Sequence, residues 1–169
     1  MKRLSSIFFL LAFAAVVFAG DAQVNFSGEW NLNKDKSDQP SGRRRGRTSA
    51  FKMTVTQKDN NLTVERIYKR RNGQKRTITE KFTLDGKKCT NEIMNRKRTS
   101  TVEWAKDGKS LIINSTMNFE RQGQNFEITS SEKWSLANGG KSLLIESTIH
   151  APRGDRSRKT FYDKATTSK

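Results

Sequence analysis

Three charged residues, Arg66, Glu80 and Glu132, lie where the sequence alternates between apolar and polar side chains, and each falls on the apolar side of that alternation. A charge in an apolar interior is costly unless an opposite charge or water neutralises it. We therefore expect Arg66 to face Glu80 or Glu132, either as a structural ion pair or as the polar end of a ligand site. A register shift of one residue would instead expose all three. The two carboxylates are also the only candidates for acid–base catalysis, and because no supporting motif accompanies them we expect no enzymatic activity.

Metal and nucleophile chemistry has few candidates in this chain. Cys89 is its single cysteine and His150 its single histidine. One residue of each type excludes an internal disulfide and a Cys/His zinc site, and no motif such as G-x-S-x-G accompanies the histidine. We therefore expect no metal and no cofactor, a small buried side chain at Cys89, and a surface or sheet-edge position for His150.

Arginines form the largest group of residues with binding chemistry. The chain has 33 lysines and arginines against 17 aspartates and glutamates, which gives a formal net charge of +16. Guanidinium groups bind phosphate, sulfate and carboxylate in bidentate fashion, so a cluster of them indicates an anion site, although charged loops also serve solubility alone. The candidates lie in three segments: Arg43, Arg44, Arg45 and Arg47; Arg70 and Arg71; and Arg96 and Arg98.

The first residues have the layout of a cleavable signal peptide. Lys2 and Arg3 precede an apolar stretch from Ile7 to Phe18, and small residues follow up to Ala22. We expect 1–22 to be removed, which predicts a secreted or periplasmic protein with no transmembrane segment in the mature chain. Residues 23–169 suffice for one domain. Export, and the lack of an RNP aromatic motif or helix-turn-helix pattern, argue against a specific nucleic-acid partner despite the charge.

The elements that must position these residues are strands. From residue 51 onward the hydrophobicity has a period of two, and turn residues recur every eight to twelve positions, as in all-β sandwiches and barrels. Short Asn-Gly and Asp-Gly turns supply the positive φ that tight hairpins need. The predicted strands are Gly28 to Asn33, Phe51 to Gln57, Asn61 to Lys69, Lys75 to Leu84, Lys88 to Met94, Thr99 to Ala105, Ser110 to Phe119, Asn125 to Leu136, Ser142 to His150 and Arg158 to Lys164.

About ten strands joined by hairpins make an antiparallel up-and-down meander. Twist accumulates along such a sheet and its two edges would stay exposed, so we expect it to close into a β-barrel. Residues 34–50 are polar and contain Pro40, Gly42 and Gly46, which predicts a basic loop between the first two strands.

Two short motifs give this meander a family resemblance. Phe26-Ser27-Gly28-Glu29-Trp30 in the first strand resembles the Gly-x-Trp motif of the calycin barrels, the lipocalins and fatty-acid-binding proteins, and Phe161 to Lys164 resembles the terminal Tyr-Glu-Lys of the latter. The pattern is also similar to small exported bacterial lipocalin-like proteins. The resemblance implies a ligand-binding barrel in which Trp30 plugs the closed end. One departure is Thr160, where fatty-acid-binding barrels carry a carboxylate-gripping arginine; Arg158 lies one inward step away.

Alternate residues along the long strands define the predicted interior. Each inward stripe has a serine near its middle, which indicates either room for a ligand or a narrow, water-bridged core. We expect Arg66 and Tyr162 to orient a polar head group. The predicted ligand-binding residues are Arg66, Tyr68, Glu80, Ile113, Ser115, Met117, Phe126, Ile128, Ser130, Glu132, Ile145, Ser147 and Tyr162.

The connections of an up-and-down barrel alternate between its two ends, and this sorting places all three arginine segments at one end. In calycins that end is the open mouth. The sequence therefore predicts a monomeric, exported barrel that holds a small hydrophobic or anionic amphiphilic ligand behind an arginine-rich mouth. The alternative is an interaction module with a filled core that binds anionic cell-surface polymers or lipids through the same loops.

Overall fold

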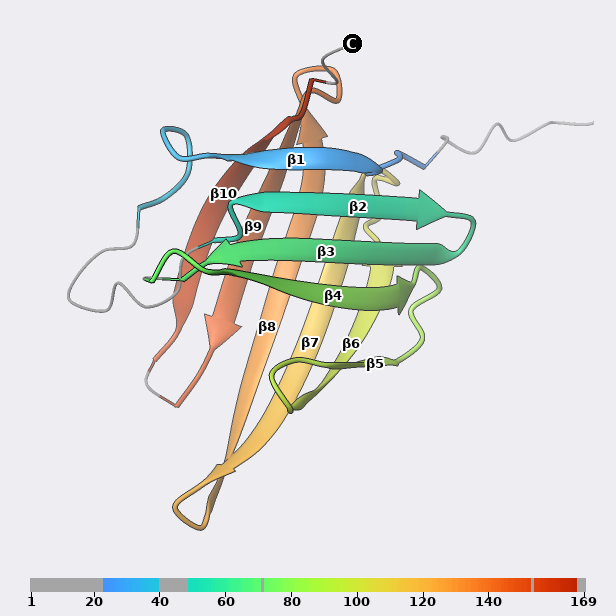
Figure 1. The fold of residues 1–169 in the computed structure, drawn as a ribbon. Coiled ribbons are helices and arrows are strands. Elements are labelled where there is room, and N and C mark those ends of the chain that lie inside the picture. Colours follow the sequence, from blue (N-terminus) through green and yellow to red (C-terminus); the bar gives the residue numbers. More distant parts are fainter. Residues whose placement is uncertain (1–22, 40–48, 71, 153, 167–169) are drawn as a thin grey trace, which may run out of the picture.

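The computed structural model describes residues 23–39, 49–70, 72–152 and 154–166, and within them every regular element is a strand (Figure 1). The predicted signal peptide, 1–22, lies outside the described residues. The ten strands are β1 (Gly28–Asn33), β2 (Lys52–Lys58), β3 (Asn61–Lys69), β4 (Lys75–Thr83), β5 (Cys89–Glu92), β6 (Lys97–Trp104), β7 (Ser110–Arg121), β8 (Gln124–Ala137), β9 (Ser142–His150) and β10 (Arg156–Lys164). The predicted all-β meander is confirmed.

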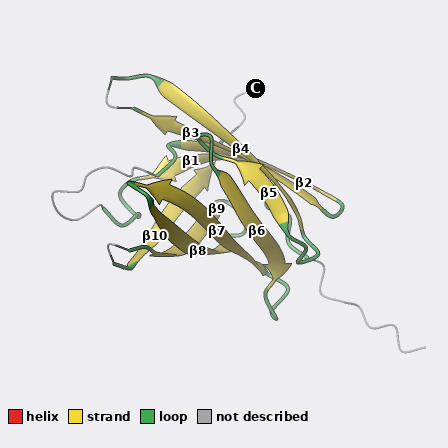
Figure 2. Cartoon of the chain, turned by 90° about the horizontal axis from the view of Figure 1, so that it is seen from below, coloured by secondary structure: helices red, strands yellow, loops and turns green. Residues whose placement is uncertain are grey.

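The strands form one antiparallel sheet in the order β4-β3-β2-β1-β10-β9-β8-β7-β6-β5. The first strand pairs with the last, with Trp30 opposite Lys164, so the sheet folds back on itself. β1 to β4 cross one side of the molecule at a steep angle to β6 to β10 on the other, and Figure 2 shows the same two groups from below. The result is a nearly closed barrel of the calycin type.

Several predicted strand ends were wrong by one or two residues: β6 and β10 each begin two residues earlier than predicted, at Lys97 and Arg156, and the ends at two hairpins have a clear cause. β5 ends at Glu92 rather than Met94, because the chain turns on Met94 and Asn95, which have φ of 55° and 58°. β7 and β8 run two and one residues further than predicted, to Arg121 and from Gln124, because Gln122 and Gly123 make a left-handed two-residue turn. The second hairpin therefore projects beyond the barrel (Figure 1).

Side chains join the two free edges of the sheet, β4 and β5, which share no backbone ladder. The side-chain amide of Asn91 accepts a hydrogen bond from Lys81 N at 2.8 Å and donates one to Lys81 O at 2.9 Å. It thus pairs with Lys81 as the backbone of a neighbouring strand would. Cys89 Sγ accepts from Thr83 N at 3.2 Å. The sequence predicted a small buried side chain at Cys89, but Cys89 is only half-buried, because its thiol lies at this seam and pairs with the edge strand.

The core fills the barrel beside β1. Phe26, Trp30 and Trp134 are each fully buried, and the Trp30 indole donates to Phe26 O at 3.0 Å. Gly28 has φ of +146°, and a Cβ there would lie 2.9 Å from Cε of Lys164, whose ammonium stands 5.4 Å from the Trp30 ring. The glycine of the Gly-x-Trp motif thus makes room for the last strand over the tryptophan.

Candidate functional site

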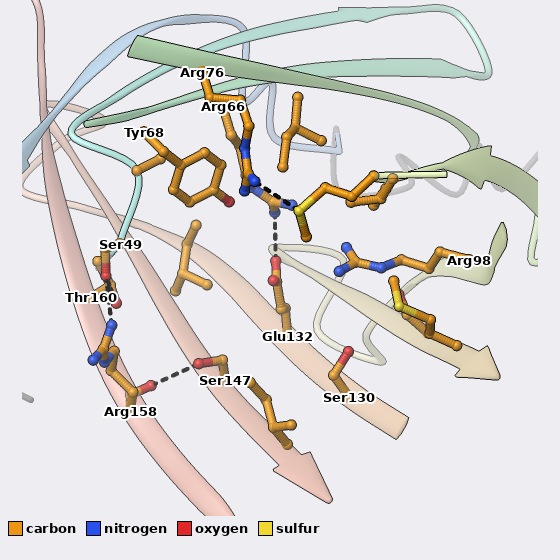
Figure 3. Close-up of a pocket in the computed structure, with 18 of the residues that line it drawn as sticks. Ser49, Arg66, Tyr68, Arg76, Arg98, Ser130, Glu132, Ser147, Arg158 and Thr160 are labelled. Atoms are coloured by element: carbon orange, nitrogen blue, oxygen red, sulfur yellow. Dashed lines mark hydrogen bonds and ion pairs between the residues drawn. The ribbon is translucent and has the colours of Figure 1, made fainter. Parts of the chain in front are cut away.

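A cavity of about 530 Å³ opens between the two groups of strands (Figure 3). Its walls combine apolar side chains, such as Ile128 and Ile145, with hydroxyls on β7, β8 and β9 and with cationic groups. Ten of the thirteen predicted ligand-binding residues line it: Arg66, Tyr68, Ser115, Met117, Ile128, Ser130, Glu132, Ile145, Ser147 and Tyr162. The inward serines therefore border open space and not a closely packed core.

The inward charges form an ion-pair cluster of Arg66, Glu80, Arg98 and Glu132. Arg66 contacts Glu80 through Nη1 at 2.6 Å and Glu132 through Nη2 at 2.7 Å. Arg98 Nη1 contacts the other oxygen of Glu80 at 2.9 Å. Two guanidiniums thus face two carboxylates, with Arg66 and Glu80 only 8% and 1% exposed. The cluster balances its own charge, which favours the structural interpretation of Arg66 over a role in gripping a ligand head group.

Burial and the carboxylates act in opposite directions on Arg66. Desolvation by itself lowers the pKa of its guanidinium, but Glu132 and Glu80 outweigh that penalty, so the pKa lies above its usual value. The Trp134 indole also donates to Glu132 Oε2 at 2.9 Å, and the Arg66 guanidinium lies 5.5 Å from the centre of that ring. The cluster is therefore fixed from four strands, β3, β4, β6 and β8, and from the core beneath it.

Two tyrosines add neutral polar groups to the cavity wall. Burial raises the pKa of both Tyr68 and Tyr162, because the phenolate is disfavoured away from water. Both hydroxyls are therefore protonated at neutral pH and able to donate a hydrogen bond. Tyr162 is 4% exposed and packs in the core cluster, so mainly Tyr68 presents its ring toward the rim.

The segment where fatty-acid-binding barrels place an arginine is arranged differently here. Thr160 is buried at the cavity wall, and its Oγ1 lies 3.5 Å from Ser49 Oγ. Arg158, one inward step earlier on β10, lines the cavity and donates through Nη1 to Ser49 Oγ at 3.0 Å (Figure 3). β10 thus carries a cation at Arg158, two residues nearer the rim than the position where fatty-acid-binding barrels place their arginine.

Three predicted ligand-binding residues do not line the cavity. Glu80 lies beneath it, enclosed by Arg66 and Arg98. Ile113 has the predicted inward orientation but is buried in the core at 3% exposure. Phe126 stacks on Phe119 at a centroid distance of 5.5 Å, because its hairpin projects past the barrel.

The predicted arginine mouth is only partly described. Arg70 and Arg98 line the cavity, whereas Arg96 stacks on Phe119 with its guanidinium carbon 4.7 Å from the ring centre. Arg43, Arg44, Arg45, Arg47 and Arg71 lie outside the described residues.

The described wall nevertheless carries a clear excess of positive charge. It holds six basic residues, Arg66, Lys69, Arg70, Arg76, Arg98 and Arg158, and one acidic residue, Glu132. With the carboxylate of Glu80 beneath it, the described part of the wall has six basic side chains against two acidic ones. Such an excess favours an anion inside the cavity.

Several cavity residues were not among the predicted ligand-binding residues, including Arg76 and Ile78 on β4. Alternation along this strand places both on the same face as Glu80, so the signal was present in the sequence. Ile93 and Met94 also line the cavity, but they belong to the β5–β6 turn, where alternation gives no signal.

Within the described ranges, no three histidine, cysteine, aspartate or glutamate side chains are grouped so that they could hold a metal ion. The same residues include no helix with the length and hydrophobicity to cross a membrane.

Comparisons with known proteins identify the fold. No protein-family model matches the chain, and no curated protein sequence matches it either. Among solved structures it is similar to the zebrafish ileal bile acid-binding protein complexed with cholic acid, with a TM-score of 0.51 and 17% sequence identity over 83% of this chain and 98% of that one. The chain therefore has the calycin-like barrel fold that its strand pattern and its two terminal motifs predicted.

Proposed function

We propose that this protein binds a small amphiphilic molecule, with an apolar body and an anionic group, inside its barrel. The observation that carries the proposal is the cavity of about 530 Å³ with its excess of cations. Pockets that bind small molecules measure about 300–1,000 Å³ and combine apolar walls with a few placed polar groups. The filled core that the alternative interaction module would need does not fit an interior of this size.

The two parts of such a ligand match two parts of the wall. Met117, Ile128 and Ile145 offer apolar surface, and burying apolar area contributes about 25 cal/mol per Å². The basic groups raise the local concentration of anions and disfavour cationic molecules. The solved complex of the zebrafish protein of similar fold with cholic acid, an anionic amphiphile, supports a ligand of this kind.

The remaining parts of the proposal come from the sequence. The segment 1–22, with the layout of a signal peptide, supports a secreted or periplasmic carrier. No catalytic motif accompanies the inward carboxylates, and both of those carboxylates are bonded to arginines. We therefore propose a monomeric binding protein and not an enzyme.

The test is binding of a neutral apolar fluorophore, N-phenyl-1-naphthylamine, to the mature chain 23–169. We expect saturable binding, and we expect Ser130→Phe to weaken it at least about tenfold, because the ring would occupy the cavity. Ser131→Phe is the matched control, since Ser131 does not line this cavity and neighbouring side chains of a strand point to opposite faces.

Overpacking can itself destabilise a protein, so Ser147→Leu, a smaller addition to the same cavity, provides a second test. Failure of the wild-type chain to bind the fluorophore would refute the proposed function. Equal binding by the Ser130 and Ser131 variants would refute the assignment of the site. Native mass spectrometry of protein purified from its own exported fraction would then identify the natural ligand.

A further inference from the structure

Arg76 is a cavity arginine with a buried nitrogen that lacks a hydrogen-bond partner. Its Nε is shielded from solvent and has no hydrogen-bond partner. Its Nη1 lies 2.7 Å from Sδ of Met94, and a thioether accepts hydrogen bonds only weakly. Its guanidinium carbon lies 5.6 Å from the centre of the Tyr68 ring. Among the described residues, no carboxylate contacts it.

The contrast with the ion-pair cluster is direct. Arg66 has two carboxylates and Arg98 has one, and both arginines line the same cavity. A buried guanidinium nitrogen without an acceptor loses its hydration, and the weak thioether bond at Nη1 does not replace a charged partner. The acceptor that would complete Arg76 is therefore an oxyanion, which Nε and Nη2 would hold as a bidentate pair.

The position of Arg76 determines where that oxyanion would lie. Arg76 is opposite Tyr68 on the β3–β4 ladder, and the next inward pair, Arg66 and Ile78, leads to the ion-pair cluster. On its other side is Met94, which is 54% exposed on the β5–β6 turn. Arg76 thus stands between the balanced cluster and the exposed Met94, at the rim of the cavity.

We infer that Arg76 binds the carboxylate or sulfonate group of the ligand, and that the amphiphile therefore lies with its head at the rim. Its apolar body extends inward toward Ile145, which is opposite the buried Trp134. Tyr68 supports the guanidinium from one face, and Met94 contacts it at Nη1. This assignment rests on the proposed function and replaces Arg66 as the residue that orients the head.

The test compares two probes that differ only in their head group, dodecanoate and dodecan-1-ol. Each probe is titrated against bound N-phenyl-1-naphthylamine, and its displacement of the fluorophore is measured for the mature chain 23–169 and for its Arg76→Gln and Arg156→Gln variants. Arg156 is an exposed arginine of β10 that does not line the cavity, so it controls for the loss of net charge. We expect the wild-type chain to prefer the acid, and Arg76→Gln to weaken acid binding about tenfold to a hundredfold while leaving alcohol binding unchanged.

The outcomes separate the two proposals. A wild-type chain that binds neither fluorophore nor alcohol would end the proposed function and this inference with it. If both probes bind but Arg76→Gln leaves acid binding unchanged, or lowers acid and alcohol binding equally, the head group lies elsewhere and only this inference fails. Arg76→Lys keeps the positive charge but loses the planar guanidinium that binds an oxyanion in bidentate fashion. It should therefore recover part of the preference for dodecanoate over dodecan-1-ol.

Discussion

Glu80 connects the two arginines of the ion-pair cluster, so its loss should be costly. It is 1% exposed and accepts from Arg66 at 2.6 Å and from Arg98 at 2.9 Å. Removing one partner of a buried ion pair leaves an uncompensated charge and typically costs about 3–5 kcal/mol. We expect Glu80→Gln to lower the free energy of unfolding in urea toward that range.

Glu127→Gln is the matched control for that measurement, because Glu127 lies exposed on β8 with no ion pair among the described residues. Its effect should stay within about 0.5 kcal/mol. If the two variants have the same stability, the cluster contributes little and the structural interpretation of Arg66 is wrong.

At the residue scale, the most informative signal in the sequence was the alternation of side chains along the strands. It predicted that Arg66 would face Glu80 or Glu132, and Arg66 contacts both. It could not predict that Arg66 would be satisfied by two carboxylates at once, because that depends on how strands distant in sequence approach each other. Arg98 was assigned to a loop at the mouth, yet it lies on β6 and completes the cluster.

At the scale of elements, the seam between β4 and β5 depends on one amide side chain. Asn91 makes two hydrogen bonds to the backbone of Lys81, at 2.8 Å and 2.9 Å. We expect Asn91→Ala to lower stability by about 1 kcal/mol and to speed hydrogen exchange of the Lys81 amide several-fold, since the donor loses its acceptor. Asn114→Ala, an exposed asparagine on β7 outside the seam, is the control. Unchanged exchange at Lys81 would show that the seam is held by other contacts.

The strands themselves were predictable, because period-two alternation and Asn-Gly or Asp-Gly turns are local signals. The β5–β6 turn was not, because its first left-handed residue is Met94, a side chain that rarely adopts positive φ. The same turn places Met94 against Arg76. The element that the sequence described least well is thus the one that borders the inferred head-group site.

At the scale of the whole molecule, general rules predicted that the barrel closes, but they did not predict how its edges meet. Twist and exposed edges predict that a ten-stranded meander curls up, and β1 does pair with β10. These rules do not say which edges remain unpaired or that Asn91 and Cys89 bridge them. The net charge of +16 predicted an affinity for anions, and the cavity locates part of that charge inside the barrel.

Asp163 makes barrel closure dependent on pH. Its carboxylate accepts from Asn33 of β1 at 2.7 Å and from Ser142 of β9 at 3.0 Å, and it lies on β10 between them. The Asn33 hydrogen bond, with that from Ser142, holds the pKa of Asp163 below its usual value.

A carboxylate with a lowered pKa stabilises the fold above its unfolded pKa of about 3.9, and this contribution is lost as the pH falls through the folded pKa. Wild type should therefore exceed Asp163→Asn in stability at neutral pH by about 1 kcal/mol or less, since the group is partly exposed, and urea unfolding should show the two curves converging in acid. A difference that persists unchanged at a pH below the folded pKa would mean that the closure of β1 on β10 depends on the shape of this side chain and not on its charge.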